Sequence, residues 1–295
     1  MDRRFDVLDS WRGLAAVMVA FGHLNVASVL QDIGVGARSL HYVDFFFVLS
    51  GFVIAHSSAA RIADNTAEAK RFMVRRLFRL WPLHAFILLL FVLYQFALLA
   101  ANMAQIVAEP VAFFEQYDPA WLPLSVFLVQ AWAPMPYNTW NEPAWSISAE
   151  LFAYLVFAAV AVLNGRRTFA IMTAIGLACS ALIVVQPDIM KAVTGLALVR
   201  CLAGFGLGVM VYALFLRSKD ARLPMATALE VIMLVLVFVS VPYLPLAGFP
   251  LLLPIFCVTM YVYAFEQGAV SRVLKKRAFQ YLGERSYRSE EHTSE

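Results

Sequence analysis

The chain has 295 residues, of which 62% are hydrophobic and only 15% are charged. A soluble domain averages about 45–50% apolar and about 25% charged residues, so the composition excludes an ordinary soluble protein and predicts an integral membrane protein with several spans. The formal net charge of +3 says little about partners, and we expect a lipid bilayer but no nucleic acid to bind the chain.

An apolar run near residues 7–30 predicts the first span, and it carries Arg12 and His23 eleven positions apart. At about 100° per residue this spacing is roughly three turns, so both side chains are expected on one face of a helix. Polar groups within a span are costly unless they face protein or water, so this stripe predicts a reaction channel. Two simpler readings remain open: Arg12 reaches the membrane interface, and His23 is a hydrogen-bonded packing residue.

Apolar runs of spanning length predict an all-α fold, a polytopic transmembrane helix bundle with about eight spans. The stretch 121–132 is apolar but too short to cross, so we expect it to be interfacial or re-entrant. Three cysteines lie inside apolar runs without metal-ligand spacing, so no disulfide framework and no metal site are expected. The predicted spans lie near 7–30, 39–59, 82–101, 144–163, 168–186, 192–216, 225–243 and 245–265.

Positive charges are unevenly distributed between the predicted loops. Cytoplasmic loops of membrane proteins carry an excess of Lys and Arg, so the bias predicts a multi-pass protein with a cytoplasmic N-terminus. With that orientation, 20 of the 23 Lys and Arg residues fall in the cytoplasmic segments 1–12, 60–81, 164–168, 217–223 and 266–295.

Other polar residues are expected at the depth of His23 in the bundle. Asp44 in the second span, and Ser146, Ser148 and Glu150 in the fourth, fall near the outer ends of their spans. A carboxylate beside a histidine orients the ring and makes it more basic, which outlines a general-base arrangement. A structural ion pair is the alternative role for Asp44.

Arg200 lies about 13 Å inside the span predicted near 192–216, too deep to be a topology signal. We therefore expect its guanidinium to pair with a carboxylate or to face the channel. Gly204, Gly206 and Gly208 follow it and permit the close approach of another helix.

Four stretches in this order and spacing resemble the acyltransferase-3 family of membrane proteins, and the resemblance covers about residues 5–285. The family moves acetyl or other acyl groups onto sugars, typically in bacterial surface polysaccharides and related glycans. The four stretches are the arginine-to-histidine segment 8–23, Tyr-Val-Asp-Phe-Phe-Phe-Val-Leu-Ser-Gly-Phe at 42–52, Arg-Arg-Leu-Phe-Arg-Leu-Trp-Pro at 75–82, and Trp-Ser-Ile-Ser-Ala-Glu at 145–150.

The resemblance implies a role for each matching position. His23 matches the family's catalytic base, and Arg12 matches its partner in handling the acyl donor. Asp44 and Glu150 match polar positions of the second and fourth spans, where they are expected to orient the histidine or complete the channel. The implied donor is an acyl-CoA, usually acetyl-CoA, supplied from the cytoplasm as a substrate, and no bound cofactor is expected.

The basic motif places Arg75, Arg76 and Arg79 at the cytoplasmic mouth of the predicted channel. Arginines bind phosphates in a bidentate manner, so this cluster suits the phosphate groups of coenzyme A. The alternative is that the three arginines only set the topology by binding anionic lipid head groups.

Members of the family usually have about ten spans, so residues 1–287 are expected to form an incomplete membrane-embedded domain. Residues 281–287 resemble the approach to a further span, but the sequence then becomes wholly polar. We expect residues 288–295 to be a foreign or artefactual tail.

The sequence thus predicts a membrane-bound acyltransferase that moves an acyl group, most simply acetyl, from acyl-CoA to a hydroxyl of a cell-surface polysaccharide or glycolipid. The expected location is the bacterial inner membrane. A transporter or lipid-handling protein is the alternative, since it would use the same intramembrane Arg, His and carboxylates as a substrate or proton path. A non-catalytic scaffold is a third.

Overall fold

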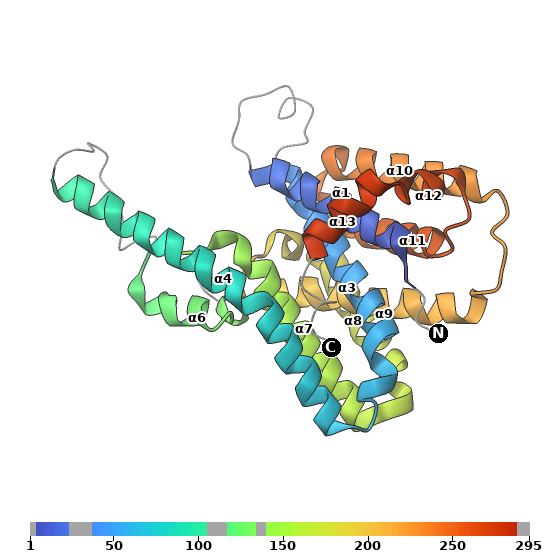
Figure 1. Cartoon of the computed structure of the whole chain (residues 1–295), viewed down its shortest axis with the longest axis horizontal. Coiled ribbons are helices and arrows are strands. Elements are labelled where there is room, and N and C mark those ends of the chain that lie inside the picture. Colours follow the sequence, from blue (N-terminus) through green and yellow to red (C-terminus); the bar gives the residue numbers. More distant parts are fainter. Residues whose placement is uncertain (1–3, 24–36, 105–116, 134–139, 288–295) are drawn as a thin grey trace.

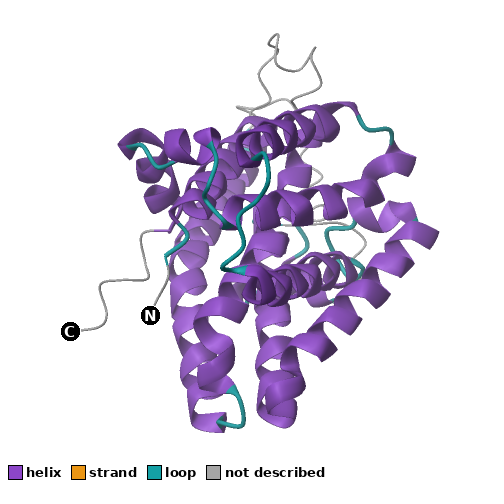
Figure 2. Ribbon diagram, turned by 90° about the vertical axis from the view of Figure 1, so that its right-hand side faces the viewer, coloured by secondary structure: helices purple, strands orange, loops and turns teal. Residues whose placement is uncertain are grey.

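The computed structural model describes residues 4–23, 37–104, 117–133 and 140–287. Every regular element in these ranges is helical and no strand occurs in them, which confirms the all-α prediction (Figure 2). Five described helical segments are long and apolar enough to cross a membrane: Tyr42–Ile62, Thr66–Met103, Glu142–Val185, Ala197–Ser218 and Ala226–Tyr243. Glu142–Val185 holds two of the eight expected spans, 144–163 and 168–186, and residues 24–30 of the first expected span lie outside the described residues.

Helices α3 (Tyr42–Ile62) and α9 (Ala197–Ser218) cross at the centre of the bundle. Glycines make the crossing close: a Cβ on Gly51 would lie 2.0 Å from the carbonyl oxygen of Phe205, and one on Gly208 would lie 2.0 Å from that of Val48. Small residues allow backbones to approach in this way where helices pack within a membrane.

The basic segment before the third predicted span is not a loop. Helix α4 runs unbroken from Thr66 to Met103 and includes Pro82. Its start is fixed by Asn65, whose side chain accepts a hydrogen bond from the backbone N–H of Glu68 at 3.1 Å. No glycine interrupts residues 66–81, so the helix begins in polar sequence and continues into the apolar run.

Three later helices match their predicted spans closely: α7 (Trp145–Asn164), α8 (Thr168–Val185) and α10 (Ala226–Tyr243). The eighth predicted span, 245–265, is not one continuous α-helix. A 3-10 helix occupies Leu246–Leu251, and α11 (Leu252–Ala264) has 13 residues, whereas about 20 are needed to cross a bilayer core.

The stretch 121–132 forms only short helices, including α6 (Leu122–Val126). The second half of α4 projects from the bundle with α6 beside it (Figure 1). The 3-10 helices are η1 (Ala37–His41), η2 (Pro119–Trp121), η3 (Gln130–Trp132), η4 (Glu142–Ala144), η5 (Gly165–Arg167), η6 (Pro187–Lys191) and η7 (Leu246–Leu251).

The first helix, α1 (Asp6–His23), packs against α13 (Arg277–Tyr287), which follows the short α12 (Ala269–Leu274). The two helices touch at glycines, since a Cβ on Gly283 would lie 2.4 Å from the carbonyl oxygen of Asp9. Residues 281–287, expected to lead towards a further span, therefore belong to a helix that lies on α1.

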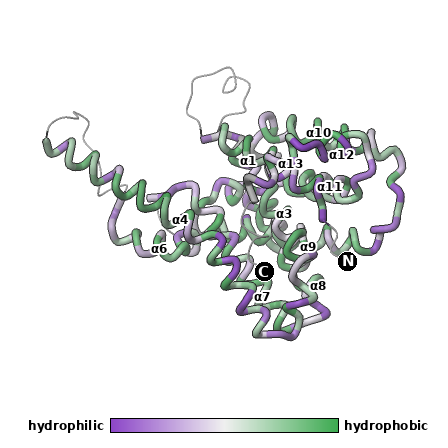
Figure 3. The backbone as a smooth tube through the Cα atoms, viewed as in Figure 1, coloured by the Kyte–Doolittle hydropathy of each residue, from purple (hydrophilic) through white to green (hydrophobic). Residues whose placement is uncertain are grey.

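Hydrophobic residues predominate along α10 and along the projecting half of α4 (Figure 3). On α4, Phe78, Phe86 and Leu89 are all exposed. An apolar surface of this extent on helices of spanning length is suited to lipid contact. The chain is an integral, multi-pass membrane protein.

Candidate active site

A cavity of about 700 Å³ lies between α1, α3, α4, the 141–144 segment and α7. Each long helix contributes residues at helical spacing, so one stripe of each faces the cavity. On α1 these are Arg12, Ala16 and Val19, and on α4 they include Arg76, Leu80 and His84.

Among the described residues, three arginines line this cavity: Arg12 from α1, and Arg76 and Arg79 from α4. The guanidinium of Arg76 lies 5.5 Å from the ring centroids of both Phe72 and Tyr154. Such aromatic contacts hold a cation by electrostatic attraction to the ring face. Arg75 is exposed and lies outside the cavity lining, because it is one residue off the stripe.

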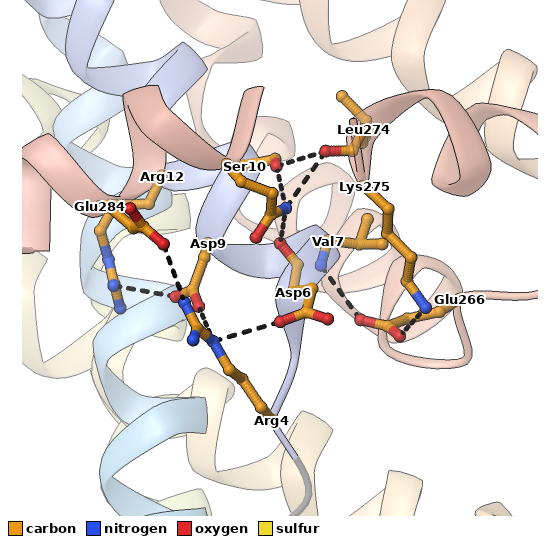
Figure 4. Close-up of polar contacts among 11 residues, drawn as sticks. Arg4, Asp6, Val7, Asp9, Ser10, Arg12, Glu266, Leu274, Lys275 and Glu284 are labelled. Atoms are coloured by element: carbon orange, nitrogen blue, oxygen red, sulfur yellow. Dashed lines mark hydrogen bonds and ion pairs between the residues drawn. The ribbon is translucent and has the colours of Figure 1, made fainter. Parts of the chain in front are cut away.

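Arg12 is held in place from its own helix. Its Nη1 lies 3.1 Å from Oδ1 of Asp9, and the other carboxylate oxygen of Asp9 lies 3.5 Å from Nε of Arg4 (Figure 4). The C-terminal segment fixes the helix itself, since Ser10 donates a hydrogen bond to the carbonyl of Leu274 at 2.7 Å. Segments more than 260 residues apart thus position this arginine.

Glu150 is the carboxylate that faces the cavity within the described part of the chain. Tyr154, one turn later on α7, donates its hydroxyl hydrogen to Oε1 of Glu150 at 2.6 Å. The Oγ of Ser50 lies 3.1 Å from the same hydroxyl. Because the tyrosine proton points to the carboxylate, Ser50 is the donor in the second bond, and the three groups form a line of hydrogen bonds along the wall.

His23 ends the described part of α1 and is exposed. It follows Val19 by one turn on the stripe that faces the cavity, but its own side chain is not part of the lining. Its Nδ1 lies 2.9 Å from the carbonyl oxygen of Val19. A carbonyl only accepts, so Nδ1 carries the hydrogen and, in the neutral ring, Nε2 holds the lone pair.

Comparison with known protein families matches residues 5–287 to acyltransferase-3, described as an acyltransferase domain. This match spans nearly the whole chain, and the cavity lies within it. The chain belongs to the acyltransferase-3 family. It is therefore an acyltransferase that transfers groups other than aminoacyl groups. Family membership favours this function over the transporter and scaffold alternatives.

Two similar proteins cover half of this acyltransferase. Protein 2 in picA locus of Rhizobium radiobacter is 30% identical over 163 residues, which are 52% of this chain and 81% of that protein. Acyltransferase MdmB of Streptomyces mycarofaciens is 32% identical over 163 residues, which are 52% of this chain and 38% of that protein. No solved structure matches.

In this acyltransferase Asp44 lies away from the cavity and does not orient His23. Its two carboxylate oxygens accept hydrogen bonds from Nε and Nη2 of Arg200 at 2.6 and 2.8 Å. Both side chains are buried, with exposed fractions of 0% and 4%, and the guanidinium lies 5.0 Å from the ring centroid of Trp145. The sequence left two roles open for Asp44 and Arg200, an ion pair or a place in the polar channel. The structure shows the ion pair, and neither residue lines the cavity.

The two serines of the fourth predicted span differ in position. Ser146 lines the cavity. Ser148 is fully buried, and its hydroxyl accepts a hydrogen bond from the backbone N–H of Ala131 at 3.2 Å. The difference follows from the helix period, since residues two apart point in different directions.

His84 and Asn141 also line the cavity, and the sequence analysis missed both. The spacing of Arg76, Leu80 and His84 carried the signal, because residues four apart lie on one face of a helix. The sequence analysis treated the basic segment as a loop that ends at Trp81, whereas it belongs to α4. A loop there would end the row of helix residues before His84, so the pattern was hidden.

Proposed function

We propose that this acyltransferase moves an acetyl or similar acyl group from acyl-CoA to a hydroxyl of a carbohydrate in a surface polysaccharide or glycolipid. The observation that carries the proposal is the placement of Arg12, Arg76 and Arg79 around one cavity with Glu150. Asp9 already pairs with Arg12, so Arg76 and Arg79 against Glu150 leave an excess of one positive charge there, which suits an anionic donor.

The phosphate groups of coenzyme A would bind at these arginines. A guanidinium presents two parallel N–H groups to a phosphate, and such charge-assisted hydrogen bonds are stronger than neutral ones. The stacking of Arg76 on Tyr154 limits the directions in which its N–H groups point. Arg75 lies on the exposed face of α4 and outside the cavity lining, so it is the control residue for this proposal.

The chemical step needs a base for the acceptor hydroxyl. That oxygen would attack the thioester carbonyl carbon, its proton would pass to Nε2 of His23, and the C–S bond would break to release the thiol of coenzyme A, which takes up a proton. The hydrogen bond from Nδ1 to Val19 leaves Nε2 available for this role. Arg12 would stabilise negative charge on the reacting carbonyl oxygen or on the donor.

The proposed location is the bacterial inner membrane with a cytoplasmic N-terminus. Acyl-CoA is a cytoplasmic metabolite, and the start of α4, which carries the basic residues, would then face its supply. The excess of Lys and Arg in the segments assigned to the cytoplasm supports this orientation.

The test uses the purified protein in lipid nanodiscs with radiolabelled acetyl-CoA and a panel of p-nitrophenyl glycosides. We expect label to move to a glycoside. Loss of a charged hydrogen bond costs about 1.5–3 kcal/mol, so Arg76→Ala and Arg79→Ala should each raise the KM for acetyl-CoA about 10-fold or more.

The matched control is Arg75→Ala, one residue away on the same helix, which should keep the wild-type KM. No transfer from acetyl-CoA by the wild-type protein would overturn the proposed donor and acceptor. If all three variants kept the wild-type KM for acetyl-CoA, the arginines would have a role in membrane topology alone.

A further inference from the structure

We propose that the side-chain oxygen of Asn141 accepts a hydrogen bond from the acceptor substrate's hydroxyl, and that His84 is the positioning residue that turns this oxygen towards the cavity. The proposal rests on the proposed function, because it concerns the hydroxyl that receives the acyl group. It adds a second group of residues to the cavity, separate from the arginines.

His84 is buried, with 3% of its surface exposed, and both ring nitrogens have partners. Its Nε2 lies 2.7 Å from the carbonyl oxygen of Ser125, which precedes the end of α6. A backbone carbonyl can only accept a hydrogen bond, so Nε2 carries the ring hydrogen. In the neutral imidazole the other nitrogen, Nδ1, is then an acceptor.

Nδ1 of His84 lies 3.2 Å from Nδ2 of Asn141. Since Nδ1 is an acceptor, it must receive an N–H from the amide, and this fixes which side of the amide faces the histidine. The carbonyl oxygen of Asn141 therefore points away from His84. No residue in the described ranges donates a hydrogen bond to it, although Asn141 is nine-tenths buried and lines the cavity.

The oxygen of Asn141 is placed where a hydroxyl would be recognised. Apolar residues that also line this cavity include Leu83, Ile87 and Ala144. An amide oxygen that lacks a donor from the described residues can accept a hydrogen bond from a substrate that brings an O–H to this point.

The two ends of the cavity are well separated along α4. Eight residues separate Arg76 from His84, which is about 12 Å of helix. On the opposite wall, Tyr154 lies against Arg76 while Asn141 lies against His84. At the His84 end, the lining residues Leu83 and Pro143 are exposed. An acceptor entering at this end would meet a donor held at the other.

The experiment uses the nanodisc protein with acetyl-CoA, the best p-nitrophenyl glycoside of the panel and its monodeoxy analogues. Asn141→Leu keeps the side-chain size and removes the amide, so the KM for the glycoside should rise about 10-fold while the KM for acetyl-CoA is unchanged. His84→Phe should do the same. The double variant should be no worse than Asn141→Leu, because His84 acts through Asn141.

Two further results identify the contact. The penalty of Asn141→Leu should vanish for the one deoxy analogue that lacks the contacted hydroxyl. Gln95→Leu is the matched control, since Gln95 is a buried polar residue of α4 outside the cavity lining, and it should leave both KM values unchanged.

A nitrogen NMR spectrum of histidine-labelled wild-type protein at neutral pH tests the pairing without activity. The signal of His84, assigned by its loss in His84→Phe, should show a protonated Nε2 and an unprotonated Nδ1. A protonated Nδ1 overturns the proposal even if transfer occurs. An unchanged glycoside KM in a well-folded Asn141→Leu overturns it while the proposed function stands. Failure of the wild-type protein to acylate any glycoside overturns the proposed function and, with it, the substrate role of Asn141.

Discussion

Tyr154 donates its hydroxyl hydrogen to Glu150 at 2.6 Å, and the two side chains line the cavity one helical turn apart on α7. Arg12, Arg76 and Arg79 line the same cavity as Glu150 and could each attract its carboxylate. The hydrogen bond from Tyr154 holds this carboxylate in one orientation. The second bond of the tyrosine oxygen, to Ser50 at 3.1 Å, ties α7 to α3 at the same level.

The first prediction removes this hydroxyl. Tyr154→Phe should lower the rate of acyl transfer about 10-fold or more, because a hydrogen bond to a charged group contributes about 1.5–3 kcal/mol. The rate is measured with labelled acetyl-CoA at saturating donor. Tyr212→Phe is the control, since the hydroxyl of Tyr212 bonds Nδ1 of His56 at 3.1 Å away from the cavity. Equal rates for the two variants would show that the bond from Tyr154 to Glu150 does not contribute to acyl transfer.

The second prediction concerns His23 as the base. His23→Ala should lower kcat about 10²–10⁴-fold with normal abundance and little change in the KM for acetyl-CoA. His23→Asn can still donate to the carbonyl of Val19 but cannot act as a base near pH 7. It should therefore be as inactive as the alanine variant. Recovery of transfer in His23→Asn would show that the residue serves packing and not proton transfer.

The third prediction tests the buried pair of Asp44 and Arg200. Breaking a buried ion pair leaves an uncompensated charge and costs about 3–5 kcal/mol, so Arg200→Met should strongly lower the thermal unfolding midpoint. The double variant Asp44→Leu with Arg200→Met should recover much of this loss, because no lone charge remains. Additive losses would mean that the two residues do not act as a pair.

The surface pair of Lys191 and Asp188, 3.2 Å apart, is the control for that measurement. Both side chains are exposed, and an exposed ion pair contributes about 0–1 kcal/mol. Lys191→Ala should therefore leave the unfolding midpoint nearly unchanged.

The fourth prediction fixes the orientation in the membrane. Single cysteines are introduced at Asp64 and at Asp188, both exposed, in a chain whose three native cysteines are replaced by alanine. A membrane-impermeant thiol reagent added to intact cells should label the site at 188 and spare the site at 64 until the membrane is opened. The reverse pattern would place the N-terminus outside and reject the charge-based topology.

Hydropathy alone located α7, α8 and α10 to within a few residues. The reason is physical: burial of a spanning helix in lipid depends on its own composition, which is written locally in the sequence. The helix that carries both Arg12 and His23 could also be predicted, because it depends only on the period of one segment, but only Arg12 of the two lines the cavity. The apolar run at 245–265 misled because Pro245 and Pro250 break it into a 3-10 helix and a short helix, which hydropathy does not register.

Contacts between distant segments could not be predicted in this way. The sequence indicated that Arg200 needs a partner, but only the crossing of α3 and α9 places Asp44 beside it, 156 positions away. Likewise, the glycine contact of α13 with α1 depends on how the chain folds back on itself. No local pattern encodes such choices, since they depend on which helices pack together.

The sequence by itself determined the membrane class, the positions of most spanning helices, the family resemblance and the arginines expected near the cavity. The tertiary structure decided which of these residues meet: Arg76 and Arg79 but not Arg75 face the cavity, and Asp44 is taken up by a buried ion pair. It also added His84 and Asn141, whose pairing exists only once α4 lies beside the segment that leads into α7. Composition and period are properties of single segments, whereas a site is a property of their packing.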